Sequence, residues 1–215
     1  MPFLSDLIGQ PFVLFATALA FLVALTVHEF SHALVATLLG DDTAKRLGRL
    51  TLNPAAHLDP WGTLMLIFVG FGWGKPVPYN PYNLRWPKWG PVAVGLAGPV
   101  SNLLLGTVML IIALIVGPWL GPNNLFVIFL VTCVQINVVL MLFNLIPLPP
   151  LDGSNVLLAL LAGPRYAAIR RFIVTTGPFI LIGLVVLDTF GNFGFFEVLF
   201  NGPLQFVSNI LSTRI

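Results

Sequence analysis

Residues 11–39 have the sequence PFVLFATALAFLVALTVHEFSHALVATLL, which is apolar except for four hydroxyl residues and the motif HEFSH at 28–32. The run is longer than the ~20 apolar residues that a helix needs to cross a bilayer. Ionisable groups inside such a helix are energetically costly and usually functional. The stretch therefore predicts a membrane-spanning helix that carries the chemistry of the protein.

The composition of the whole chain supports a membrane protein. Hydrophobic residues make up 57% of the 215 residues, charged residues make up 8%, and the mean hydropathy is +0.95. Soluble domains carry about 25% charged residues. A chain with so little charge cannot cover a water-facing surface, so lipid is its expected solvent.

The basic residues indicate how the chain is oriented. All ten Lys and Arg lie in clusters at 45–49, 75–88 and 165–171 or at the C-terminus. Basic loops are retained in the cytoplasm. We therefore expect a multi-pass protein of the cell membrane, with its N-terminus outside and the loops at 41–60, 75–89 and 163–171 inside. These clusters are short and lack interleaved aromatic residues, so no nucleic-acid partner is expected.

The remaining segments predict an all-α polytopic membrane protein with about four to six membrane segments, in a single domain over residues 1–215. A short β or re-entrant element is expected on the cytoplasmic side, together with a broken helix at the active site. The expected elements are spanning helices at 90–117, 125–146 and 172–190, a strand pair at 43–52, a re-entrant or interfacial dip at 61–74, and an interfacial or re-entrant tail at 195–212.

The helix break is predicted by the segment LIPLPPLDG at 145–153. Its three prolines remove backbone donors and leave carbonyls unpaired. Such backbone is tolerated at membrane depth only where it is packed in protein or lines a cavity. We expect a water-accessible cavity here, with the helix resuming over 154–162.

The HEFSH motif has the spacing of a zinc site. His28 and His32 are four residues apart, so both imidazoles leave the same face of a helix. Two such nitrogens can bind one zinc ion, and the neighbouring carboxylate of Glu29 can act as general base on the attacking water. We therefore expect one Zn²⁺ per chain and no soluble cofactor.

A third protein ligand is needed, because catalytic zinc usually has three. His32 lies eight residues before Gly40, about 12 Å along the helix from its cytoplasmic end. Asp152 lies 13 residues before Arg165, which corresponds to about 20 Å from the same side if helical. Asp152 is therefore the expected ligand. The other acidic or histidine candidates are His57, Asp59, Asp188, Asp6, Asp41, Asp42 and Glu197.

These segments resemble the site-2 protease family of intramembrane metalloproteases. HEFSH is similar to the HExxH motif of the family, and NLIPLPPLDG at 144–153 is similar to its N-x-x-P-x-P-x-L-D-G motif. NPAAHLDPWGT, GWGKPVPYNP and AGPVSN, at 53–63, 72–81 and 97–102, resemble the compact branch of the family that lacks a PDZ domain.

The resemblance implies roles for five residues. His28, His32 and Asp152 would bind zinc, and Glu29 would be the general base. Asn144 matches an asparagine that holds the substrate backbone. The chain has Ser154 where the family often has a second glycine, which is a small departure.

Two other polar residues allow alternative interpretations. His57 could be a transient ligand or an inhibitory cap, or it could brace a turn with Asp59. Asn102, like Asn137, could donate to an oxyanion or could form a hydrogen bond between helices.

The expected function is that of a membrane zinc endopeptidase acting on transmembrane segments of membrane proteins. An unwound substrate could pair with the edge of the 43–52 strands. Two alternatives are a catalytically idle membrane binder and a metal or proton transporter. The intact HEFSH motif argues against the first, and the lack of a duplicated half argues against the second.

Overall fold

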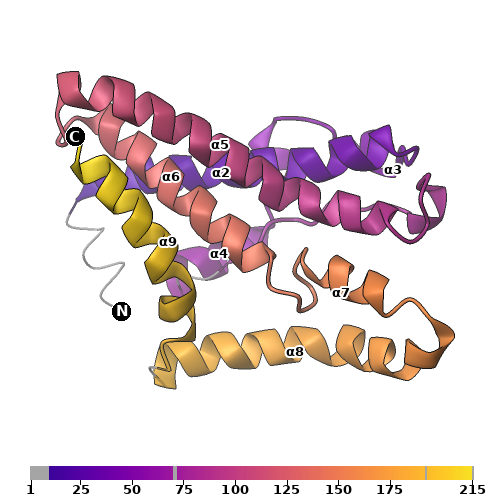
Figure 1. Cartoon of the computed structure of the whole chain (residues 1–215). Coiled ribbons are helices and arrows are strands. Elements are labelled where there is room, and N and C mark those ends of the chain that lie inside the picture. Colours follow the sequence, from indigo (N-terminus) through magenta and orange to yellow (C-terminus); the bar gives the residue numbers. More distant parts are fainter. Residues whose placement is uncertain (1–9, 70–71, 192, 215) are drawn as a thin grey trace.

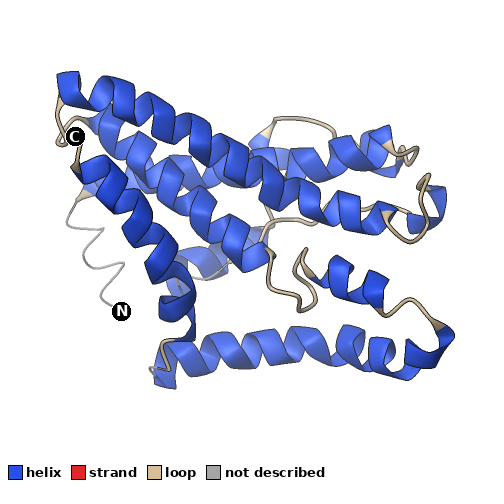
Figure 2. Cartoon of the chain, viewed as in Figure 1, coloured by secondary structure: helices blue, strands red, loops and turns tan. Residues whose placement is uncertain are grey.

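The computed structural model describes residues 10–69, 72–191 and 193–214, and this part of the chain consists of helices joined by loops and turns (Figure 2). The only β pairing among these residues is an isolated bridge between Leu58 and Gly74. Short 3₁₀ turns lie at Pro54–Ala56, Pro81–Asn83 and Pro164–Tyr166. The α-helices are α2 (Pro11–Leu38), α3 (Thr43–Arg46), α4 (Pro60–Val69), α5 (Gly90–Leu120), α6 (Leu125–Asn144), α7 (Ser154–Leu160), α8 (Ala167–Gly191) and α9 (Phe195–Ser212).

Four helical segments are long and apolar enough to cross a membrane. They are α2, α5, α6 and the segment Pro164–Gly191, which contains α8. This confirms an all-α, multi-pass membrane protein with crossings close to the expected ranges. The fourth helix begins earlier than expected, at Ala167, so its first turns include the basic residues Arg170 and Arg171.

The centre of the molecule is formed by α2, α5 and α6, which pack against one another (Figure 1). Small residues make the close packing possible, as is usual for helices in membranes. Ala20, Ala24, Ala33 and Ala36 on α2 are fully buried. At the opposite end from α3, α9 packs against α6, and its Val207 and Leu211 join a cluster with residues of α5 and α6.

Helix α8 runs apart from this bundle in Figure 1. It touches the segment between α6 and α7 at one small residue, since a Cβ built on Gly177 would lie 2.9 Å from Pro149 Cδ. Large apolar side chains such as Phe172, Phe179 and Phe190 are exposed along α8. Lipid is the natural solvent for such a surface.

The predicted helix break is confirmed, since α6 ends at Asn144 and α7 begins at Ser154. The chain turns back on itself between them, and the Gly153 amide donates to the Asn144 carbonyl at 2.7 Å. A Cβ on Gly153 would lie 2.3 Å from the Leu145 carbonyl oxygen, so only glycine fits. This reversal fixes the position of Asp152.

The expected strand pair at 43–52 is wrong. Residues Thr43–Arg46 form the helical turn α3 instead. The reason lies in Asp41, whose Oδ1 accepts hydrogen bonds from both the amide and the hydroxyl of Thr43 and so starts the turn. Gly48, with a φ of +70°, lies just beyond its end. No strand edge exists there to receive a substrate.

The two short or interrupted segments are helices. α4 has ten residues, about 15 Å at 1.5 Å per residue, which is too short to cross a bilayer. Its re-entrant or interfacial position stays a prediction, and residues 70–71 of the predicted dip lie outside the described residues. The tail at 195–212 is the continuous helix α9, which is not among the four candidate spans.

Candidate metal centre

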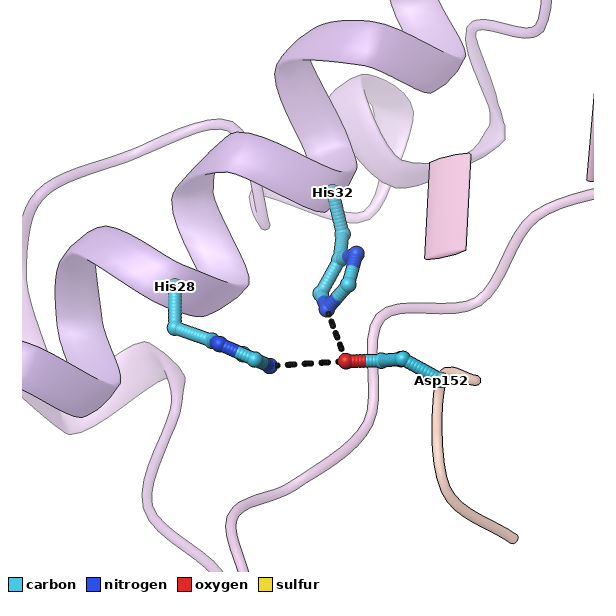
Figure 3. Close-up of side chains that lie close together, drawn as sticks. All are labelled: His28, His32 and Asp152. Carbon is cyan, nitrogen blue, oxygen red and sulfur yellow. Dashed lines mark ion pairs between the residues drawn. The ribbon is translucent and has the colours of Figure 1, made fainter. Parts of the chain in front are cut away.

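Three predicted ligands from two distant parts of the sequence meet at one point (Figure 3). His28 and His32 extend from successive turns of α2, and Asp152 extends from the break between α6 and α7. Asp152 Oδ2 lies 3.1 Å from His28 Nε2 and 3.3 Å from His32 Nε2. The three ligand atoms lie within 4.8 Å of one another, and both histidines are buried.

The second nitrogen of each imidazole is held by α5. His28 Nδ1 lies 2.6 Å from Asn102 Oδ1, and His32 Nδ1 lies 2.7 Å from the Val94 carbonyl oxygen. Both oxygens are acceptors, so both Nδ1 atoms carry the proton. In the neutral imidazoles, each Nε2 therefore presents a lone pair. Such partners fix the orientation of metal-binding histidines.

This arrangement fits a divalent cation. Two lone pairs and a carboxylate oxygen converge, and Asp152 Oδ2 is buried without a hydrogen-bond partner in the described structure. A buried carboxylate oxygen that faces two imidazole lone pairs and accepts no hydrogen bond is costly unless a proton or a metal compensates it. Two imidazole nitrogens and one carboxylate are a usual protein ligand set of catalytic zinc.

Glycines of α5 make room for this centre. A Cβ on Gly98 would lie 2.4 Å from His28 Cε1 and 2.5 Å from His32 Nε2. A Cβ on Gly95 would lie 2.6 Å from Asn155 Nδ2 and 3.0 Å from the Asp152 carbonyl oxygen. Helix α5 therefore shapes the site although it provides no ligand. The AGPVSN segment at 97–102 contains Gly98 and was the sequence signal that could have placed this glycine at the site.

Asn102 belongs to a hydrogen-bonded chain between helices. Its amide nitrogen lies 2.8 Å from Asn137 Oδ1, and Asn137 donates in turn to the Cys133 carbonyl oxygen at 2.8 Å. Both asparagines are fully buried. Of the two interpretations left open by the sequence, hydrogen bonding between helices is the one seen here. Its contact with His28 adds an orienting role that the sequence did not reveal.

Glu29, the predicted general base, follows His28 directly and is 8% exposed. Its Oε2 is buried and has no hydrogen-bond partner among the described residues. The carboxylate is thus not consumed by a structural contact, which leaves an acceptor available beside the metal ligands.

His57 and Asn144 lie outside the ligand trio. His57 is fully buried, and its Nε2 lies 2.8 Å from the Thr51 carbonyl oxygen. It braces the loop through Thr51 and not through Asp59, which instead accepts the Gly62 amide at the start of α4. Asn144 donates to the Leu140 carbonyl oxygen of its own helix at 3.0 Å. The substrate role of Asn144 stays a prediction, as does a ligand or capping role of His57.

The fold and the site together define a multi-pass helical membrane protein with a His–His–Asp cluster whose two histidines are buried. Residues 120–184 match the model of peptidase family M50. This match confirms the resemblance to the site-2 protease family that was found in the sequence.

The chain is also similar to bacterial proteins named as candidate zinc metalloproteases. YwhC of Bacillus subtilis is 43% identical over 145 residues, which cover 63% of this chain and 64% of YwhC. Rip2 of Mycolicibacterium smegmatis is 32% identical over 140 residues, covering 63% of this chain and 53% of Rip2. Rip2 of Mycobacterium tuberculosis is 30% identical over 178 residues, covering 77% and 63%. The chain thus spans less than two thirds of each relative. No solved structure matches it.

Proposed function

We propose that this chain is an intramembrane zinc metalloendopeptidase that hydrolyses peptide bonds within or near transmembrane segments of other proteins. One observation carries the proposal: two imidazole nitrogens from α2 and a carboxylate oxygen from the α6–α7 break converge within 4.8 Å, and the next residue on α2, Glu29, has a buried oxygen without a hydrogen-bond partner. The names of the relatives, which describe them as zinc metalloproteases, support the same chemistry.

In this proposal His28 Nε2, His32 Nε2 and the Asp152 carboxylate hold the zinc. Zinc, when bound, lowers the pKa of water and polarises a carbonyl group. Glu29 accepts a proton from water as the water oxygen bonds to the scissile carbonyl carbon. The same proton then passes to the amide nitrogen as the C–N bond breaks, which gives a new carboxyl end and a new amine. Asn102 and the Val94 carbonyl keep the two imidazoles in the required orientation.

Substrates would be membrane proteins whose spanning helix unwinds locally, because a helix hides its amides in its own hydrogen bonds. The non-helical segment 75–80 is a better partner for an unwound substrate than the absent strands at 43–52. Within the described residues, 76–79 make no backbone hydrogen bond. Tyr79 donates to Asn155 Oδ1 at 3.4 Å, and Asn155 donates to the Asp152 carbonyl oxygen. The segment therefore runs beside the metal centre, where a substrate strand could pair with it.

The proposed setting is the cell membrane, with the active site nearer the cytoplasmic face and cleavage serving regulated intramembrane proteolysis. The decisive experiment compares membrane proteomes of cells that carry the wild type and the Glu29→Gln variant. Membrane proteins that accumulate uncleaved only with the variant are the expected result. Identical proteomes, with wild-type protein that is folded and zinc-loaded, would refute the peptidase and favour a binder or a transporter.

The third ligand is tested by metal content. Asp152→Ala should lower zinc occupancy, because a lost ligand opens the site. The matched control is Asp59→Ala, which removes an acidic residue outside the ligand trio. Full zinc occupancy in Asp152→Ala would show that another residue completes the site.

A further inference from the structure

A cleft lies between the segment 79–91 and helix α7, beside the metal centre but outside the ligand trio. Its volume is about 230 Å³. Tyr79, Lys88 and three prolines line it from the segment 79–91, and Asn155 and Leu158 line it from α7. Most of these side chains are apolar, and Lys88 is the charged residue among those that line the cleft.

Helix α5 shows how far this cleft lies from the ligand trio. Pro91, at the start of α5, lines the cleft. A Cβ on Gly95 would lie 2.6 Å from Asn155 Nδ2, and a Cβ on Gly98 would lie 2.4–2.6 Å from atoms of both histidine rings. Residues 91, 95 and 98 share one face of the helix. Seven residues at 1.5 Å each place the cleft about 10 Å along α5 from the metal ligands.

Asn155 separates the cleft from the metal centre. Its Nδ2 donates to the Asp152 carbonyl oxygen at 3.1 Å, and its Oδ1 accepts from the Tyr79 hydroxyl at 3.4 Å. Tyr79 also belongs to the segment 75–80, with which an unwound substrate could pair. An extended strand advances about 3.3 Å per residue. A substrate side chain in the cleft would therefore lie about three residues from the scissile bond.

The size and charge of the cleft favour a glutamate side chain. Pockets for small molecules measure about 300–1,000 Å³, so this smaller cleft suits one side chain of a peptide. The Lys88 ammonium lies 5.0 Å from the centroid of the Trp89 ring. The ion pairs of the described residues are confined to the His–His–Asp cluster, so Lys88 has no carboxylate partner among them. A glutamate could place its methylene groups against the prolines and its carboxylate against Lys88.

We propose that this cleft is a substrate subsite, which receives the side chain about three residues from the scissile bond, and that Lys88 selects an acidic residue there. The subsite lies on the expected cytoplasmic side of the scissile bond, because the segment 79–91 belongs to a basic loop. The proposal rests on the peptidase function given above and adds a preference among its substrates.

The test uses a membrane protein that accumulates uncleaved with Glu29→Gln and whose cleavage site has been mapped. Glu, Gln or Lys is introduced in turn at the second, third and fourth residues on the cytoplasmic side of the scissile bond. At one of these positions, kcat/KM of the wild type should be about threefold higher for Glu than for Gln and about tenfold higher than for Lys. Lys88→Glu should reverse the order, so that the Lys substrate is cleaved fastest.

Comparing substrates within one enzyme preparation removes any effect of the variant on folding or zinc content. The matched control is Arg85→Glu, which reverses an exposed charge of the same loop outside the cleft and should keep the wild-type order. A second readout without cleavage is the amount of each substrate retained by Glu29→Gln, which should follow the same order and should also reverse with Lys88→Glu.

Two results would overturn the subsite alone. One is equal cleavage of the Glu, Gln and Lys substrates at all three positions, as expected if Lys88 only helps to orient the loop in the cytoplasm. The other is a preference for Glu that Lys88→Glu leaves unchanged. If folded, zinc-loaded wild type cleaves none of the substrates, the peptidase function is refuted and the subsite with it.

Discussion

At the scale of single residues, Glu29 is the group whose chemistry can be isolated most cleanly. It is buried beside two metal-ligand candidates, and one of its oxygens has no hydrogen-bond partner among the described residues. Glu29→Gln keeps the size and polarity of the side chain but cannot accept a proton. General base catalysis contributes about 10²–10⁴-fold, so cleavage should fall by at least that order. Zinc content and thermal stability in detergent should stay near wild type.

The matched control for this variant is Glu197→Gln, which makes the same exchange on the exposed side of α9. It should leave cleavage, zinc content and stability unchanged. Near-normal turnover in Glu29→Gln would rule out the general-base role. A joint loss of stability and activity would instead assign Glu29 to the packing of α2.

Gly98 allows a second specific prediction at the scale of single residues. The Cβ of Gly98→Ala would lie 2.4–2.6 Å from atoms of the His28 and His32 rings, so at least one imidazole must move. Zinc affinity should fall by about 10-fold or more, as when a supporting group of a metal site is lost. The control is Gly183→Ala on α8, where an added Cβ meets nothing within 4 Å. Equal zinc affinity in both variants would mean that α5 tolerates displacement from the site.

At the scale of elements, the spanning helices were the most predictable part of the chain. The crossings expected at 11–39 and 125–146 appear as Pro11–Leu38 and Leu125–Asn144. Long apolar runs bounded by polar, proline or glycine residues fix such helices, because lipid offers the backbone no other partners. The ligand trio was predictable for a similar reason, since ionisable groups are rare at membrane depth.

The loops were less predictable, because their structure depends on contacts distant in the sequence. The 43–52 segment forms a helical turn through a buried carboxylate whose partners include residues near 80. Arg49 is buried, and the sequence does not distinguish it from its exposed neighbours. The Asn102–His28 contact joins residues 74 positions apart, and no local pattern shows it.

Asp41 links the end of α2 to the loop near residue 80, and the sequence did not reveal this link. It is fully buried and accepts hydrogen bonds from Thr43, Asn80 and Asn83. Asp41→Ala leaves these donors unpaired and should lower the free energy of unfolding by about 2–4 kcal/mol. Thermal unfolding in detergent measures the effect, and the exposed Asp42 provides the control Asp42→Ala. Equal stability of the two variants would show that the hydrogen bonds of Asp41 do not stabilise the fold.

The stability that Asp41 contributes should depend on pH. Burial alone would raise the pKa of Asp41, but hydrogen bonds from Thr43, Asn83 and Asn80 outweigh it and hold the pKa below its ordinary value. The carboxylate therefore contributes stability above the unfolded pKa of about 3.9, and this is lost as pH falls through the lower folded pKa. The stability difference between wild type and Asp41→Ala should shrink below about pH 4.

At the scale of the whole molecule, the four candidate spans and the basic loops make a testable topology. Cysteines are introduced one at a time at exposed positions in a Cys133→Ala background, because Cys133 is the native cysteine. A membrane-impermeant reagent should label Asn123→Cys and Phe193→Cys from outside and should not reach Leu47→Cys until the membrane is opened. External labelling at position 47 would invert the orientation.

Gly177 of α8 contacts Pro149 in the segment that carries Asp152. Through this contact, we expect the thickness of the bilayer to affect metal binding. α8 has 25 residues and is about 37 Å long, whereas a typical hydrocarbon core is about 30 Å thick. A long helix tilts further as the bilayer thins. Tilting α8 would press or release the segment that carries Asp152. We expect zinc retention against a chelator to change across vesicles of graded acyl-chain length, and a flat profile would mean that α8 moves independently. If zinc retention does change with acyl-chain length, the lipid composition of the membrane controls the metal centre through the tilt of α8.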